Sequence, residues 1–158
     1  MQRIILAAAL CLMAGIGQAS ASDAFKRVEG QWRGKGTIEF SNKTKETLHC
    51  RASYDVLQSG AKLQLAIRCA SDSYKIDLIG TAIEANGKVT GSWSEATLNV
   101  SGSLSGRAEG SSIKVLAASP VFTANFSLVT HGGKQSVSIR SETPDSTIRG
   151  ASISLARN

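Results

Sequence analysis

The stretch CRASYDVLQSGAKLQLAIRC, residues 50 to 69, decides the fold of this chain. Its two cysteines are equidistant from Ser59-Gly60, so a two-residue hairpin centred there would place Cys50 directly opposite Cys69. Most apolar residues fall on even positions before this turn and on odd positions after it. A two-residue hairpin requires this switch when both strands bury the same face. The stretch therefore predicts two antiparallel strands that are crosslinked by a Cys50–Cys69 disulfide.

The same alternation continues through the rest of the chain. Ten short segments alternate apolar with polar residues. The apolar residues change between even and odd positions at turn signals such as Asp72-Ser73 and Asn86-Gly87. One helical turn is expected over Ser22 to Val28, with Asp23 as its cap. Because an open sheet of such strands would leave exposed edges, we predict an all-β fold: an antiparallel up-and-down β-barrel of about eight to ten strands.

The first residues indicate export. An apolar run from Ile4 to Gly17 follows a positive start, and Ala19-Ser20-Ala21 is a small-x-small site that signal peptidase accepts. We predict a signal peptide over residues 1 to 21 and a single β-barrel domain over residues 22 to 158. Cys11 leaves with the signal, so two cysteines remain in an oxidising compartment, which we expect to be the periplasm. No later run reaches the about 20 apolar residues of a membrane span, which predicts a soluble mature protein.

The charge pattern limits the partners. The chain has a formal net charge of +6, with 18 basic and 12 acidic residues. Basic residues are scattered among acidic ones, without runs of like charge or interleaved aromatic residues, so the pattern gives no support to nucleic-acid binding. The basic excess favours solubility or loose attraction to anionic envelope polymers.

The reactive side chains form no catalytic or metal-binding pattern. His49 lies outward on an expected strand and His131 lies in a glycine turn, and neither has a cysteine or carboxylate at a ligand-like spacing. Gly102 to Gly106 has the glycines of a nucleophile elbow, but leucine stands where the serine is needed. A disulfide-bonded cysteine is no thiol nucleophile. The sequence therefore predicts a protein that is not an enzyme and that uses neither metal nor cofactor.

Five side chains form the candidate ligand site. The alternation places Trp93 and Glu95 inward at the end of one strand, and it also turns Tyr54, Tyr74 and Trp32 inward. Glu95 is the one charged residue that the alternation sends inward on the expected strands. It either reaches water at the rim of the barrel or orients a ligand above an aromatic floor.

Glycines recur on the inward face, at positions 34, 36, 80, 91 and 102. They indicate either a barrel hollowed for a ligand or room for bulky neighbours, such as Trp93 opposite Gly80. The sequence leaves both interpretations open.

Three resemblances add expectations. Gly30-Gln31-Trp32 resembles the glycine-x-tryptophan that begins the first strand of lipocalins and other calycin barrels, which implies a ligand-binding barrel. Arg68 to Ser71 and Gly91 to Glu95 resemble a family of exported proteins of alphaproteobacteria, which implies no activity. Gly30 to Cys69 resembles periplasmic inhibitors of bacterial metalloproteases, in which a segment ahead of an eight-stranded barrel inhibits; that segment would be Ser22 to Glu29.

Two functions follow as hypotheses. The first is an exported barrel that binds a small, largely apolar ligand in the periplasm. The second is an interaction protein of the envelope, either a protease inhibitor or a structural partner, that uses its rim or outer face.

Overall fold

The structure, a computed structural model, describes residues 23 to 158, so the predicted signal peptide and Cys11 lie outside the described residues. One short helix precedes ten strands. The elements are α1 (Ala24–Val28), β1 (Gly30–Phe40), β2 (Lys45–Leu57), β3 (Lys62–Ala70), β4 (Lys75–Ala85), β5 (Lys88–Glu95), β6 (Val100–Glu109), β7 (Ser112–Ala118), β8 (Thr123–His131), β9 (Lys134–Ser141) and β10 (Ile148–Arg157).

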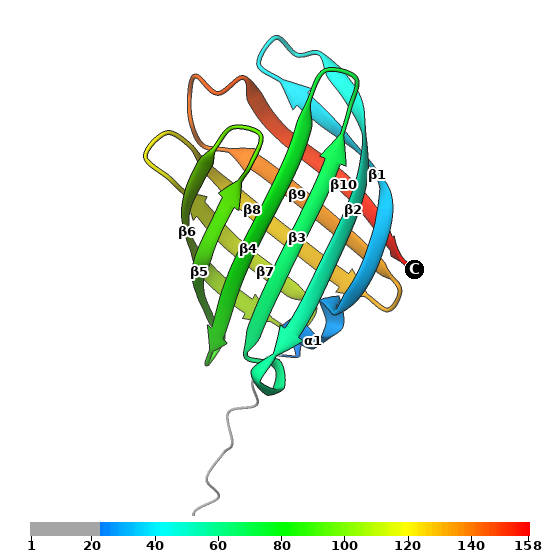
Figure 1. Ribbon diagram of the computed structural model, residues 1–158, viewed down its shortest axis with the longest axis vertical. Coiled ribbons are helices and arrows are strands. Elements are labelled where there is room, and N and C mark those ends of the chain that lie inside the picture. Colours follow the sequence, from blue (N-terminus) through cyan, green and yellow to red (C-terminus); the bar gives the residue numbers. More distant parts are fainter. Residues whose placement is uncertain (1–22) are drawn as a thin grey trace, which may run out of the picture.

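Each strand pairs antiparallel with its neighbours in sequence, and β1 also pairs with β10, so the sheet closes on itself (Figure 1). This confirms the predicted all-β up-and-down barrel. Among the ten strands that the structure describes, closure leaves no unpaired edge, which removes the aggregation hazard of an open sheet. Within residues 23 to 158, no helix has the length and hydropathy to cross a membrane.

The predicted register of the central hairpins is confirmed. Cys50 lies opposite Cys69 on β2 and β3, and Gly80 lies opposite Trp93 on β4 and β5. The Asn86-Gly87 turn joins β4 to β5 with positive φ angles of 53° and 80°, as a type I′ turn requires.

The turn at Ser59-Gly60 is longer than predicted. Pairing of β2 with β3 ends at Leu57 and Lys62, and a 3₁₀ turn over Gln58–Gly60 lies in the loop between them. The loop keeps the predicted centre, and with an even number of residues it preserves the switch of the buried face. The turn at Asp72-Ser73 is longer in the same way, because pairing of β3 with β4 ends at Ala70 and Lys75.

Several inward glycines are required by close approach of a neighbouring strand. A Cβ on Gly34 would lie 1.9 Å from the carbonyl oxygen of Ser154 in β10, and a Cβ on Gly102 would lie 1.9 Å from that of Ala118 in β7. The space that a side chain would occupy is thus already filled by backbone. These glycines permit strong coiling of the sheet and do not hollow the barrel.

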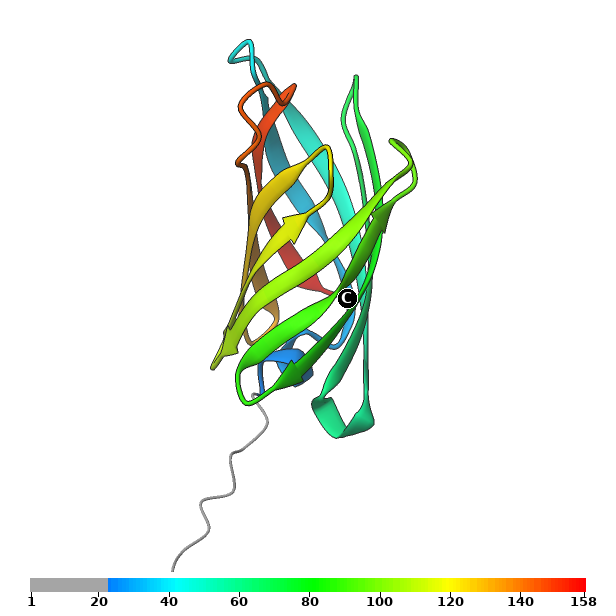
Figure 2. The same ribbon diagram turned by 90° about the vertical axis from the view of Figure 1, so that its left-hand side faces the viewer.

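The helix α1 forms where a helical turn was expected, but it is capped differently. The side chain of Asp23 makes no capping hydrogen bond; its carbonyl oxygen accepts the Arg27 N–H at 3.0 Å, and its carboxylate pairs with exposed Lys26. The helix buries its apolar residues Ala24, Phe25 and Val28. It contacts β2, β6 and β8, and it lies at the lower end of the barrel in Figures 1 and 2.

Candidate functional site

The two ends of the barrel differ. We call the end that holds α1 the closed end and the opposite end, where β1–β2, β3–β4, β5–β6, β7–β8 and β9–β10 turn, the open end (Figure 2). At the closed end, Phe25 and Trp32 are 0% and 1% exposed. Near the open end, inward apolar side chains remain partly exposed; they include Phe40, Tyr74, Ile76, Leu78, Phe126, Ile139 and Ile148. Val56 and Leu65, nearer the closed end, are partly exposed as well, so most but not all of the partly exposed inward apolar side chains lie toward the open end.

A small apolar cavity lies in the interior. It has a volume of about 20 Å³, and its lining comprises Cys50, Ile67, Cys69, Ile76, Leu78, Phe126, Val137, Ile139, Ile153 and Leu155. By the same measure one water needs roughly 10–15 Å³ and several polar partners, which this lining does not offer. The cavity is too small to enclose an organic ligand unless the side chains around it move.

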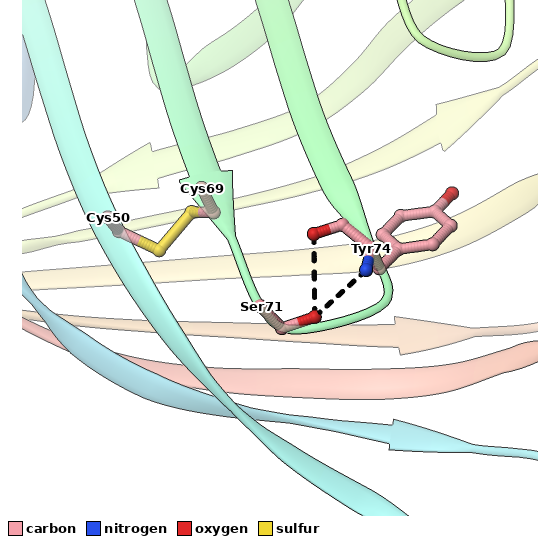
Figure 3. Close-up of a disulfide and its surroundings, with 4 residues drawn as sticks. All are labelled: Cys50, Cys69, Ser71 and Tyr74. Carbon is pink, nitrogen blue, oxygen red and sulfur yellow. Dashed lines mark hydrogen bonds between the residues drawn. A yellow bond between two sulfur atoms is a disulfide. The ribbon is translucent and has the colours of Figure 1, made fainter.

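The disulfide forms one wall of this cavity. Cys50 and Cys69 are joined across β2 and β3 and are 3% and 5% exposed (Figure 3). The predicted pairing is thus confirmed, and its sulfur atoms face the barrel interior. Because one bond ties two adjacent strands directly beside the cavity, it limits how far β2 and β3 can separate there.

Two of the predicted ligand residues, Trp32 and Tyr54, lie at the closed end. The Trp32 Nε1–H donates to the Val28 carbonyl oxygen at 2.7 Å, which ties α1 to β1. Tyr54 is 1% exposed, and its hydroxyl donates to Oε1 of Gln135 at 3.0 Å; the Gln135 amide donates in turn to the Thr130 hydroxyl. Burial raises the pKa of Tyr54 well above its usual value. This buried polar chain links β2, β9 and β8 and leaves the Tyr54 hydroxyl already paired.

Trp93 is packed between strands. It is 6% exposed, its Nε1–H donates to the Ser103 carbonyl oxygen at 3.2 Å, and its ring meets Phe122 edge-on at 6.4 Å. The indole lies against the backbone of Gly102, where a Cβ would come 3.0 Å from Nε1. The glycine therefore accommodates the ring, as the packing interpretation expects.

Glu95 holds the β5–β6 turn. The side chain is 8% exposed, and its carboxylate accepts backbone N–H groups from Asp77, Thr97 and Leu98 at 2.8, 3.1 and 2.6 Å. Burial alone would raise the pKa of Glu95, but these hydrogen bonds outweigh it and lower the pKa below the ordinary value. The carboxylate oxygens are thus already hydrogen-bonded to the backbone of β4 and of the turn.

Tyr74 is the predicted residue closest in position to the mouth, on the turn between β3 and β4. Its backbone N–H donates to the Ser71 hydroxyl at 3.1 Å (Figure 3), and its ring meets Phe40 edge-on at 6.4 Å. Burial, with a smaller contribution from the negative charge of Glu95, raises the pKa of Tyr74. Tyr74 therefore remains a neutral hydrogen-bonding group beside the open end.

The five predicted ligand residues do not form one site. Trp32 and Tyr54 lie at the closed end, Glu95 and Tyr74 lie at the open end, and none of the five lines the cavity. Their part in ligand binding stays a prediction. The cavity residues are inward in the sequence alternation, but alternation carries no signal for height along the barrel.

Further acidic side chains face inward besides Glu95. Glu84, at the end of β4, is 4% exposed and accepts the Gly87 N–H at 2.6 Å, and Glu46 accepts the Ser73 N–H and hydroxyl. The expectation that Glu95 is alone was wrong, because β4 continues to Ala85 and carries Glu84 onto the inner face. All three carboxylates brace hairpin turns.

The outer wall carries two shallow grooves. One, of about 600 Å³, crosses β3 to β6 and is lined by Gln64, Leu65, Ile79, Gly80, Thr81, Ser92, Trp93, Ser94, Ser101 and Gly102. The other, of about 440 Å³, crosses β9, β10, β1 and the start of β2 near Gly150. Both are much larger than the interior cavity, and both are open to solvent along the strands.

The described residues offer no metal site. Between Asp23 and Asn158, no three histidine, cysteine, aspartate or glutamate side chains are grouped so that they could hold a metal ion. His49 and His131 are both exposed.

Comparison with known proteins identifies a fold and not a family. No family model matches the chain, and no curated protein matches it. The crystal structure of Rv2717c from M. tuberculosis is similar, with a TM-score of 0.69 and 12% identity over 86% of this chain and 96% of that chain. The S-type phycobiliprotein lyase CPES from Guillardia theta is similar too, with a TM-score of 0.59 and 10% identity over 89% of this chain and 94% of that one. At such identities the likeness concerns the fold alone, which is that of a closed antiparallel up-and-down β-barrel.

Proposed function

We propose that this protein is a periplasmic binding barrel that takes the apolar part of a small molecule through its open end. One observation carries the proposal: around the interior cavity, inward apolar residues such as Ile76, Phe126 and Ile139 stay partly exposed, whereas α1 packs its own apolar residues into the closed end. Apolar surface that a barrel leaves exposed on its inner side is an energetic cost that a bound apolar group would remove.

The lining defines the chemistry of the ligand. All residues around the cavity are apolar or disulfide-bonded, so a charged group inside would lose its hydration without gaining a partner. The ligand's polar end would therefore stay at the open end, beside Tyr74, whose neutral hydroxyl can form a hydrogen bond with it. A molecule with one apolar tail or ring and one polar end fits this arrangement.

The test uses a neutral apolar dye, N-phenyl-1-naphthylamine, whose fluorescence increases in apolar surroundings. We expect saturable binding by the folded protein and displacement by a long-chain alcohol. Ile76→Trp, which fills the cavity from β4, should weaken dye binding about tenfold, since losing about 55 Å² of apolar contact costs about 1.4 kcal/mol.

Ile79→Trp is the matched control. Ile79 lies on the same strand but faces outward, is 54% exposed and lines the outer groove. This variant should bind the dye as the unmodified protein does. Weakening by Ile79→Trp and not by Ile76→Trp would move the ligand to the outer groove and refute the proposal.

A second function, an interaction protein of the envelope, is favoured by the size of the groove over β3 to β6. The groove has no charged side chain in its lining and exposes Ile79, which suits a protein surface. Absence of dye binding together with capture of a defined periplasmic protease would support it. The name of the Guillardia theta neighbour denotes a lyase of phycobiliproteins, but 10% identity gives no support for that activity in this chain.

A further inference from the structure

Three arginines lie side by side on the outer wall. Arg33 on β1 is directly opposite Arg51 on β2, and Arg51 is directly opposite Arg68 on β3. All three are exposed. Adjacent strands are about 4.8 Å apart, and like charges directly opposite one another across a sheet are destabilising.

The surroundings increase the positive charge. Two residues further along each strand from the Arg33–Arg51 pair, Lys35 on β1 lies opposite His49 on β2, and both are exposed. Among the described residues, the one ion pair made by this group joins Arg68 to Asp77 at 3.1 Å. We call Arg33, Lys35, His49, Arg51 and Arg68 the arginine patch. It covers parts of three strands and holds four permanent cations against one paired carboxylate.

We propose that the arginine patch docks the barrel on an anionic lipid membrane surface. Charge complementarity carries the proposal: guanidinium groups form paired hydrogen bonds with phosphate oxygens, which a lysine cannot match. The cations are distributed in two dimensions over a wall of the barrel, as the headgroups of a membrane are, and they do not follow a groove that could hold a strand.

The distribution of aromatic residues argues against nucleic acid. Proteins that bind single strands stack bases on exposed aromatic rings. In residues 23 to 158 every phenylalanine, tyrosine and tryptophan is buried or partly buried, so the patch has no stacking platform. The docking proposal does not rest on the proposed ligand, because the patch is on the outer wall and the cavity is inside.

The experiment measures flotation of the mature protein, with its disulfide intact, with two kinds of vesicle at low salt. One kind is phosphatidylcholine alone, and the other contains about 30% phosphatidylglycerol. Each cation close to an anionic surface strengthens binding roughly fivefold, so removal of three should weaken it roughly a hundredfold. We expect binding to the anionic vesicles only, and its loss in Arg33→Gln/Arg51→Gln/Arg68→Gln.

The chain supplies a matched control. Lys88, Arg107 and Lys114 form a second row of cations, directly opposite one another on β5, β6 and β7. Lys88→Gln/Arg107→Gln/Lys114→Gln removes the same charge elsewhere, and it should retain most of the binding. The Tm of Arg33→Gln/Arg51→Gln/Arg68→Gln at low salt should equal or exceed that of the unmodified protein, because like charges that lie opposite one another are removed. An unchanged or higher Tm shows that this variant loses binding without losing its fold.

Two results would overturn the proposal. Equal losses in the two triple variants would mean that net charge alone attracts the protein. Tighter binding of a single-stranded oligonucleotide than of anionic vesicles, abolished by the patch variant, would assign the patch to nucleic acid.

Discussion

The Cys50–Cys69 disulfide should contribute measurably to stability through its position in the central hairpin. The two cysteines are 19 residues apart in sequence. In the chain-entropy model, a crosslink that closes a loop of about 20 residues stabilises the folded state by about 3 kcal/mol. Reduction of the folded protein should therefore lower the free energy of unfolding by about that amount, because the unfolded chain regains the freedom of the loop.

Replacing both cysteines by alanine should cost more than reduction does. The variant loses the crosslink and also two sulfur atoms that form one wall of the cavity. Removing about 40 Å³ of packed volume, at about 24 cal/mol per Å³, adds about 1 kcal/mol. The expected total for Cys50→Ala/Cys69→Ala is about 4 kcal/mol, and the enlarged cavity should bind the neutral dye more tightly.

Urea unfolding followed by tryptophan fluorescence measures these differences. The oxidised protein, the reduced protein and the alanine variant are compared, and the variant is measured with and without reductant as a control for other effects of the reductant. Equal stability of the oxidised and reduced forms would refute the reasoning. So would thiol labelling of both cysteines in the unreduced, folded protein.

Other substitutions test the alternation, the turn and the closure of the barrel. Ile67→Asp should unfold the domain, whereas Gln64→Asp on the outward face of the same strand should be tolerated; circular dichroism distinguishes the two. Glu95→Gln should lower stability by about 2 kcal/mol at pH 7. The fold lowers the pKa of Glu95, so its carboxylate stabilises above the ordinary carboxyl pKa; in urea titrations at falling pH, the difference from wild type should disappear once Glu95 is protonated. Gly34→Ala should lower stability by about 1–3 kcal/mol, because its Cβ would meet the Ser154 carbonyl oxygen at 1.9 Å; an unchanged Tm would contradict this close approach.

The fold was predictable because the barrel repeats one local rule. A loop with an even number of residues switches the buried positions between odd and even, as from β2 to β3, and a loop with an odd number keeps them, as from β1 to β2. In both cases the alternation on the two strands fixes the register without fixing the loop. The loop between Leu57 and Lys62 shows the difference: its centre is the predicted Ser59-Gly60, but its length is not. Positive φ at Gln58 and Ser59 is not a signal that these residue types carry. Turn length was therefore the part of the hairpin that the pattern could not specify.

The site was less predictable because alternation assigns a side chain to a face and not to a height. Tyr54 and Tyr74 are both inward, yet one is paired with Gln135 at the closed end and the other borders the open end. The strands are tilted around the barrel, so position within a strand does not give the height. Glu95 adds a second reason: its three backbone donors come from β4 and from the following turn, and no sequence spacing marks them.

The volume of the interior depends on the same coiling that the inward glycines permit. An inward glycine makes room only if the neighbouring strand does not enter that room, and at Gly34 and Gly102 the neighbouring backbone does enter it. At Gly80 a Cβ would meet its nearest atom at 3.2 Å, so this position is less crowded. An inward glycine in the sequence can therefore mean either that a neighbouring strand approaches closely or that the interior has open space. Among the residues that the structure describes, most of the partly exposed inward apolar side chains lie instead toward the open end, away from the buried Phe25 of α1. Under the proposed function, a ligand would have to displace side chains around the cavity of about 20 Å³, so its binding should depend on how easily the open-end hairpins separate.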